Sequence, residues 1–187
     1  MDSNFVGVTD MCTTFLPLLM RSRGVILNNG SVAGLLPIPW MSVYIASKAA
    51  LRAYTNILRL ELAPLGVRVF YLQTANVKTL IFREEPTLQP GSMYTAVYDR
   101  YAALLRTIVS TGSTPTDFSR EVVTKLLGRG TWFSGWGGWE IWAGEGAWMY
   151  WFMTYLDNLL PGNLLANFYG RMNHLQNLTC PTVEPTR

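Results

Sequence analysis

The chain has 187 residues, enough for one domain to bury a hydrophobic core without disulfide bridges, and 49% of them are hydrophobic while only 14% are charged. This composition excludes a chain that is disordered over most of its length. The formal net charge of +3 comes from 15 Lys and Arg and 12 Asp and Glu scattered along the sequence, so we expect no nucleic-acid partner.

A few residue types indicate the cellular compartment and whether a metal site is expected. Two cysteines, Cys12 and Cys180, are too few for a disulfide framework and favour a reducing compartment. The N-terminal residues include Asp2 and no basic region, which is not typical of a signal peptide. No His, Cys and carboxylate residues share metal-ligand spacing, and His174 is interpreted as a surface or helix-end residue. We expect a cytoplasmic protein without a metal site, either free or at the surface of an internal membrane.

The first part of the chain alternates between helical and strand patterns. Apolar residues recur at three- and four-residue steps over 4–20, and small and apolar residues do so over 43–63, which predicts two amphipathic helices. Short apolar runs at 25–28 and 67–73 predict buried strands. This alternation is typical of an α/β fold whose parallel strands are joined by helical crossovers.

In the second part of the chain, the sequence patterns predict a long loop, four helices and one more strand. The loop over 74–92 is rich in Pro, Thr and Glu and is too long for a simple connection, so it is a candidate lid over a substrate. A third strand is expected near 139–142. Helical patterns occupy 94–109, 114–127, 147–160 and 163–175.

Six tryptophans gather in the last third of the chain. Such side chains either fill a core or form a surface that faces lipid or stacks on a substrate. We interpret them as core side chains, with contact to a membrane surface as the alternative. The six are Trp132, Trp136, Trp139, Trp142, Trp148 and Trp151.

Three polar residues are candidates for one reactive site. Tyr44 and Lys48 lie four positions apart on a predicted helix, so they project from the same face. The ammonium of Lys48 favours an ionised phenol, which makes Tyr44 a usable proton donor or acceptor. Ser31 follows the exposed end of the first strand, where its hydroxyl can hold a carbonyl oxygen. Together they predict an acid/base centre for a carbonyl compound.

The residues around this centre resemble the signature of the short-chain dehydrogenase/reductase family. They stand in the sequences NGSVAG (29–34) and YIASKAA (44–50). The resemblance extends back to DSNFVG (2–7) and forward through LRLEL (58–62) to VRV (67–69), so it covers the first 80 residues. The region with Pro37, Pro39 and Trp40, together with Ala143-Gly144 and the helices that follow, is most similar to fungal reductases of the acyl-dihydroxyacetone phosphate type.

The resemblance implies a role for each matched residue. Tyr44 would be the catalytic acid/base, Ser31 would orient the carbonyl, and Lys48 would hold the nicotinamide ribose and favour the ionised tyrosine. Asn4 would anchor a water molecule in a proton relay. Thr79, together with Lys48, would contact NADP if that cofactor is bound.

The sequence departs from the family pattern at its start. Family members begin with a strand, a Gly-rich turn and a helix that cradle the pyrophosphate, and these do not precede Asn4 here. We therefore expect a truncated Rossmann-like α/β fold, the second half of a doubly wound parallel sheet with a helical, Trp-rich C-terminal region. We treat 1–187 as a single domain, with a catalytic core at 1–80 and a substrate lid and C-terminal helices at 81–187.

Three functions fit these residues. The preferred expectation is a cofactor-independent cyclase, isomerase or dehydratase of fungal secondary metabolism, acting on a carbonyl or enol of an apolar polyketide or lipid-like substrate. The alternative is NADPH-dependent carbonyl reduction by a fragment, with NADP as cofactor once the missing half is supplied. The third is a non-catalytic subunit that pairs with a full-length relative. Family members dimerise through the helices near 4–20 and 43–63, so we also expect a homo-oligomer.

Overall fold

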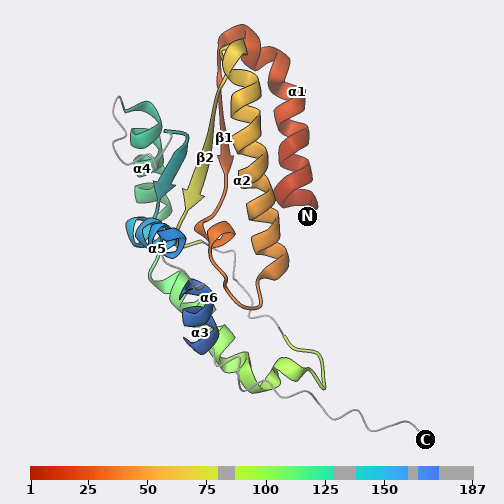
Figure 1. Ribbon diagram of the computed structural model, residues 1–187, viewed down its shortest axis with the longest axis vertical. Helices are drawn as coiled ribbons and strands as arrows, with labels where there is room; N and C mark the ends of the chain where they lie inside the picture. The colour runs from red at the N-terminus through yellow and green to blue at the C-terminus, as the bar shows by residue number, and fades with distance from the viewer. Residues whose placement is uncertain (80–86, 129–137, 160–163, 173–187) are drawn as a thin grey trace, which may run out of the picture.

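Three parallel strands form the centre of the molecule (Figure 1). They are β1 (Val25–Asn29), β2 (Arg68–Thr74) and β3 (Glu140–Ala143), in the order β1-β2-β3. This confirms the predicted α/β fold with parallel strands. The computed structural model describes residues 1–79, 87–128, 138–159 and 164–172.

The strand register brings all three C-terminal ends to one edge of the sheet. Asn29 at the end of β1 lies opposite Leu72, and Thr74 at the end of β2 lies opposite Ala143. Parallel strands need crossover connections, and helices supply them between β1 and β2 and between β2 and β3. Polar groups that follow the strands therefore gather at this edge.

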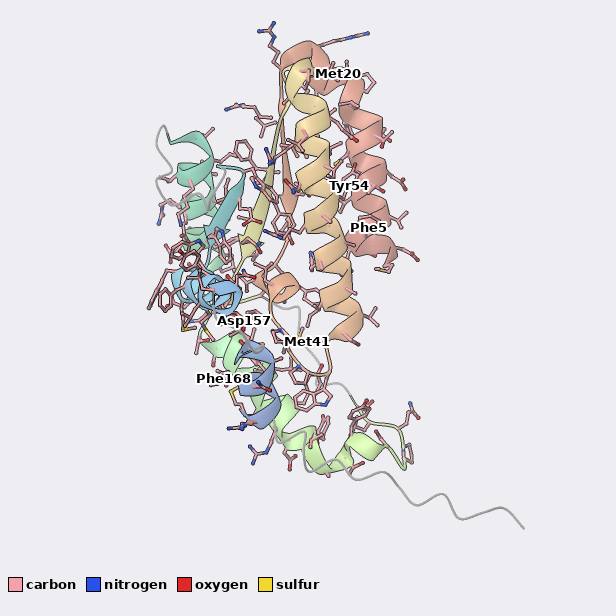
Figure 2. All side chains as sticks on the ribbon, viewed as in Figure 1. Phe5, Met20, Met41, Tyr54, Asp157 and Phe168 are labelled. Atoms are coloured by element: carbon pink, nitrogen blue, oxygen red, sulfur yellow. The ribbon has the colours of Figure 1, made fainter. Side chains whose placement is uncertain are left out.

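Two long helices cover one face of the sheet (Figure 1). They are α1 (Gly7–Ser22), which follows a π-helical turn at Asp2–Val6, and α2 (Ser42–Leu62). The rings of Phe5 and Tyr54 meet edge to face between these helices, with centroids 6.0 Å apart (Figure 2). The core beneath them consists of Cys12, Ile26, Leu58, Leu62, Val67 and Val69.

Both helices also expose apolar side chains. Met11 and Leu18 on α1 are 58% and 59% exposed, and Ile57 and Leu60 on α2 are 54% and 55% exposed. Scattered exposed apolar residues are normal, but pairs on both helices are compatible with the oligomer expected through this surface. That oligomer stays a prediction.

The opposite face carries α4 (Pro115–Leu127), which packs on β3. The start of α4 is the one predicted from the sequence: the Thr114 hydroxyl accepts a hydrogen bond from the Asp117 backbone at 3.2 Å, and Pro occupies the first helical position. Near the other end of α4, the Lys125 ammonium donates to the backbone oxygen of Trp142 at 2.7 Å. This bond ties the helix to the end of β3.

The remaining helices lie beyond the C-terminal ends of the strands (Figure 1). They are α3 (Tyr98–Ser110), α5 (Ala147–Leu159) and α6 (Leu164–Met172). Helix α3 begins four residues later than the helix predicted at 94–109, because Met93–Val97 forms a 3₁₀ turn capped by the Ser92 hydroxyl. The core at this end consists of Val32, Leu36, Trp142, Ala147, Leu165 and Tyr169.

The tryptophans of the last third do not share one environment. Trp142 is only 7% exposed, as expected of a core residue, whereas Trp148 on α5 is 73% exposed. The prediction of a core side chain is therefore wrong for Trp148, because α5 is apolar around most of its circumference and packs on only part of it. Trp132 and Trp136 lie outside the described residues. Within the described part of the chain, no helix is long and apolar enough to span a membrane.

Candidate active site

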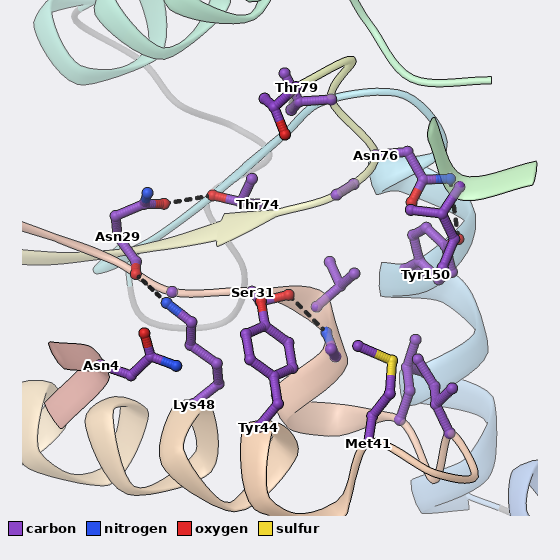
Figure 3. A pocket seen from close by; sticks show the side chains of 18 of the residues that line it. Asn4, Asn29, Ser31, Met41, Tyr44, Lys48, Thr74, Asn76, Thr79 and Tyr150 are labelled. Carbon is purple, nitrogen blue, oxygen red and sulfur yellow. Dashed lines mark hydrogen bonds between the residues drawn. The ribbon is translucent and has the colours of Figure 1, made fainter. Parts of the chain in front are cut away.

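A cavity of about 310 Å³ opens at the C-terminal ends of β1 and β2 (Figure 3). We name it the strand-end cavity. Its walls come from the turn after β1, from α2, from the segment after β2, and from side chains of α3, α5 and α6. Open α/β sheets bind their ligands in this position, because loops leave the strands there and side chains from separate crossovers meet.

All five residues singled out from the sequence line the strand-end cavity: Asn4, Ser31, Tyr44, Lys48 and Thr79. Ser31 is 9% exposed, while Tyr44 and Lys48 are half-buried. In Figure 3 the hydroxyl of Tyr44 points toward Ser31. The fold thus brings together residues from four separate segments, and their catalytic roles remain predictions.

The Ser31 hydroxyl is held at the start of a 3₁₀ turn, Val32–Leu35. Its oxygen accepts a hydrogen bond from the Ala33 backbone at 3.1 Å, and Ser31 itself is extended, with φ −162° and ψ 146°. A hydroxyl has one donor and two acceptor positions, so this bond leaves its proton available. Ser31 can therefore donate to a carbonyl oxygen in the cavity.

Tyr71 on β2 is a site residue that sequence reasoning missed. Its hydroxyl accepts from the Ser31 backbone N–H at 3.3 Å and donates to the Lys48 backbone oxygen at 3.1 Å, which joins the turn after β1 to α2. Tyr71 is fully buried, and burial raises its pKa to about 12, so the hydroxyl keeps its proton near neutral pH. In the sequence it stands in an apolar run typical of a core strand. The available signal was its polar tip, because a buried tyrosine hydroxyl usually has a partner.

Lys48 reaches across the cavity floor from α2 to β1. Its ammonium donates to the Asn29 backbone oxygen at 3.0 Å, and Nζ lies 5.9 Å from the centre of the Tyr44 ring. Burial lowers the pKa of Lys48 below its usual 10.5, because desolvation disfavours the charged form. An ammonium has three N–H donors, so two remain for ligand groups in the cavity.

We expect the lowered pKa of Lys48 to be measurable directly. With lysine labelled with ¹³C at the ε carbon, the Lys48 signal should titrate with a midpoint below 10.5, because the half-buried ammonium gives up its proton at a lower pH than a free one. The signal is assigned by its disappearance in Lys48→Arg. A Lys48 midpoint at or above 10.5 would contradict the burial seen here.

Asn4 enters the site from the π-helical turn that precedes α1. Its side-chain amide donates to the Ser47 hydroxyl at 3.2 Å, and that hydroxyl donates to the Tyr44 backbone oxygen at 2.6 Å. Asn4 is therefore held against the turn of α2 that carries Tyr44. Single π-helical turns occur often at functional sites, but the water-anchoring role of Asn4 stays a prediction.

The segment after β2 forms the far wall of the cavity. The Asn76 backbone oxygen accepts from Ser113 at 3.0 Å and from Glu145 at 3.1 Å, and its side-chain amide donates to the Tyr150 hydroxyl at 3.5 Å. The first residues of the predicted lid are thus bonded to the turns before α4 and α5. Residues 80–86 of that predicted lid lie outside the described residues.

The cavity carries little charge. Of its described lining side chains, Lys48 is the charged one, and an apolar side is formed by Ile38, Met41, Leu104 and Ile108. In the part of the chain that the structure describes, no three His, Cys, Asp or Glu residues come close enough to hold a metal ion. The arrangement suits a neutral carbonyl group attached to an apolar body.

The sheet and the site at its C-terminal edge define a Rossmann-like α/β protein. Solved structures of short-chain dehydrogenases have this fold. One from Streptomyces avermitilis matches with a TM-score of 0.61 at 20% identity, over 83% of this chain and 54% of that one. One from Burkholderia cenocepacia, in complex with NADP, matches with a TM-score of 0.61 at 22% identity, over 90% of this chain and 55% of that one.

Sequence comparison relates the first half of the chain to one family. Residues 1–89 match the short chain dehydrogenase family. The chain is 38% identical over 142 residues to the NADPH-dependent 1-acyldihydroxyacetone phosphate reductase of Schizosaccharomyces pombe, covering 71% of this chain and 47% of that protein. It is 40% identical over 128 residues to a short-chain dehydrogenase of Penicillium ochrochloron, covering 67% of this chain and 47% of that protein. The chain thus spans about half the length of these curated relatives.

Proposed function

We propose that this chain carries the carbonyl-binding and proton-donating half of an NADPH-dependent carbonyl reductase. The observation that carries the proposal is that Ser31, Tyr44 and Lys48 line one cavity at the strand ends, with the Tyr44 hydroxyl directed toward Ser31 (Figure 3). The names of the relatives favour reduction over the cofactor-independent cyclase or isomerase that the sequence suggested first.

In this mechanism each side chain has one task. The Ser31 hydroxyl donates a hydrogen bond to the substrate carbonyl oxygen and fixes its position. Tyr44 gives its proton to the same oxygen as the carbonyl carbon is reduced, so an alcohol forms rather than an alkoxide. The Lys48 ammonium stabilises the phenolate that remains on Tyr44.

The polar side of the cavity fits the nicotinamide end of the cofactor. The two unused N–H groups of Lys48 are available to bind ribose hydroxyls, and Thr79 lines the same cavity from its far wall, in the segment after β2. The nicotinamide, when bound, supplies the hydride to the carbonyl carbon. The family resemblance supports this assignment of the cofactor contacts to Lys48 and Thr79.

The nucleotide-binding half would pack at the outer edge of β1. In the described residues β1 pairs with β2 alone, so its other edge has unpaired backbone groups. Beside it lies an open groove of about 390 Å³ lined by Met11, Cys12 and Ile26 among others. An unpaired strand edge next to an apolar groove is where a further strand and its helix would continue the sheet.

The proposed substrate is an uncharged apolar ketone. The fission yeast relative is named for a phosphate ester, but among the described lining residues Lys48 is the one cationic side chain that a phosphate group could meet. Phosphate recognition normally uses several donors or a guanidinium fork. The apolar side of the cavity instead favours hydrocarbon.

A chimera tests the proposed function. This chain would be joined to the part of the fission yeast reductase that it does not match, and NADPH consumption would be followed with 2-undecanone, a neutral ketone. We expect NADPH loss that depends on the ketone, with one alcohol formed for each NADPH oxidised. The chain alone serves as the control for chemistry that needs no cofactor.

The outcomes separate the candidate functions. A folded chimera that binds NADPH but does not reduce the ketone would overturn the reductase proposal. Conversion of a carbonyl compound into an isomer by the chain alone, without NADPH, would instead support the acid/base enzyme that was expected first.

A further inference from the structure

A second cavity, of about 520 Å³, lies beside the strand-end cavity and has aromatic walls. We name it the aromatic cavity. The rings of Trp40 and Tyr101 meet in its wall, with centroids 5.4 Å apart and planes inclined at 58°. Its lining residues are Pro39, Trp40, Ser42, Leu88, Tyr94, Val97, Tyr98 and Tyr101.

The two cavities share their walls. Trp40 and Ser42 line the aromatic cavity, while Met41 between them lines the strand-end cavity. The same division occurs on α3, where Tyr101 lines the aromatic cavity and Ile108 lines the strand-end cavity. These two residues are about 10 Å apart along the helix axis, at a rise of about 1.5 Å per residue. The two cavities are therefore neighbours at the start of α2, where Met41 of one lining stands between Trp40 and Ser42 of the other.

The backbone at the wall is held in an unusual conformation. Trp40 has φ 67°, in the left-handed region that a bulky residue rarely adopts. Its contact with Tyr101 helps to hold the indole in the cavity wall despite this conformation. Backbone strain of this kind persists only where the surroundings impose it, and it gathers at ligand sites.

We propose that the aromatic cavity holds the apolar tail of the ketone whose carbonyl lies between Ser31 and Tyr44. The inference rests on the proposed function for the position of the carbonyl. The tail would leave the strand-end cavity along its apolar side, pass Met41 and lie against the rings of Trp40 and Tyr101. The ligand is thus an extended hydrophobic ketone rather than a compact one, and the aromatic cavity selects for tail length.

Binding, rather than turnover, provides the test. Equilibrium dialysis of the full chain against 2-butanone and 2-undecanone should show the longer ketone bound roughly tenfold more tightly or better, because its tail buries additional apolar surface. Tyr101→Ala removes part of the aromatic wall and should reduce that preference to about threefold or less. Tyr155→Ala, the same substitution on α5 outside both cavities, is the matched control and should keep the preference.

A second variant is needed because Tyr101→Ala could lose the preference simply through poorer packing of the protein. Ser42 is an exposed residue at the first position of α2, so Ser42→Phe adds a ring to the aromatic cavity without removing a core contact. We expect it to abolish the preference for 2-undecanone and leave 2-butanone binding unchanged. Retention of the preference in both variants, or its equal loss in Tyr155→Ala, would overturn the proposal.

The test remains independent of the reductase chemistry. Tyr44→Phe should keep the preference for the longer ketone, because binding the tail needs no proton transfer. A chimera that reduces 2-butanone and 2-undecanone with equal kcat/KM would refute the tail site while leaving the proposed reduction intact. A chimera without activity, but with the binding preference present in the chain, would refute the reduction and leave the tail site standing.

Discussion

Replacing Tyr44 with phenylalanine is expected to slow ketone reduction by the chimera by about 10²–10⁴-fold, the range that a positioned general acid contributes. The substitution removes one oxygen, the proton source for the carbonyl, and nothing else. The ring can keep its place beside the Lys48 ammonium, which lies 5.9 Å from the ring centre. The loss should therefore appear in kcat, with ketone binding and folding retained.

The matched control is Tyr155→Phe, which removes a hydroxyl from an exposed tyrosine on α5 that lines neither cavity. Its kcat should stay within about twofold of the parent, as is usual for a surface substitution. The measurement is the initial rate of NADPH loss at saturating ketone. A Tyr44→Phe chimera that retained more than about a tenth of the parent rate would refute the role of Tyr44 as proton donor.

Replacing Gly30 with alanine is expected to damage both folding and the site. A Cβ atom at this position would lie 1.9 Å from Cζ of Tyr71 and 2.2 Å from its hydroxyl oxygen. Tyr71 is fully buried, so the ring has no free space to move into. Either the turn that carries Ser31 or the Tyr71 ring must shift, and overpacking of this kind costs about 1–3 kcal/mol, sometimes more.

The same clash should lower activity beyond its effect on folding. The Tyr71 hydroxyl bonds both the Ser31 backbone and the Lys48 backbone, so its displacement moves two parts of the site at once. A misplacement of about 1 Å can cost on the order of 10²-fold in rate. The free energy of unfolding would be measured by urea denaturation, and kcat by NADPH loss under conditions where the variant is folded.

Gly170→Ala supplies the comparison for Gly30→Ala. No heavy atom lies within 4 Å of a Cβ built at Gly170, which is within α6. Alanine there should be neutral or stabilising by up to about 1 kcal/mol, because it favours the helix. A Gly30→Ala protein with the stability and kcat of the parent would show that Tyr71 does not hold the turn in the way described.

Sequence patterns predicted helices and strands well where the signal comes from neighbouring residues. The bounds of α2 and β3 fall within one residue of the expected ranges, and α4 begins at the expected cap, Thr114. The predicted start of α3 was four residues too early because Met93–Val97 has apolar spacing that a 3₁₀ turn satisfies as well as an α-helix. Periodicity alone does not distinguish the two over one turn.

The candidate site likewise contains some contacts that the sequence predicts and others that it does not. The pairing of Tyr44 and Lys48 is a property of helical spacing, and so it was available from the sequence. The roles of Tyr71 and Gly30 were not, because the contact between Ser31 and Tyr71 joins residues 40 positions apart, one in the turn after β1 and the other on β2. The aromatic cavity is another contact of this kind, since Trp40 and Tyr101 come from separate crossovers.

By itself the sequence determined the order of helices and strands, the family resemblance of the first 80 residues and the face of α2 that carries the reactive pair. These properties depend on neighbours within one or two helical turns. Only the tertiary structure decided which groups surround that pair: the strand register places Tyr71 behind Ser31, and the packing of α3 beyond the sheet encloses the aromatic cavity. The physical reason is that close packing of distant segments, rather than local periodicity, sets these contacts.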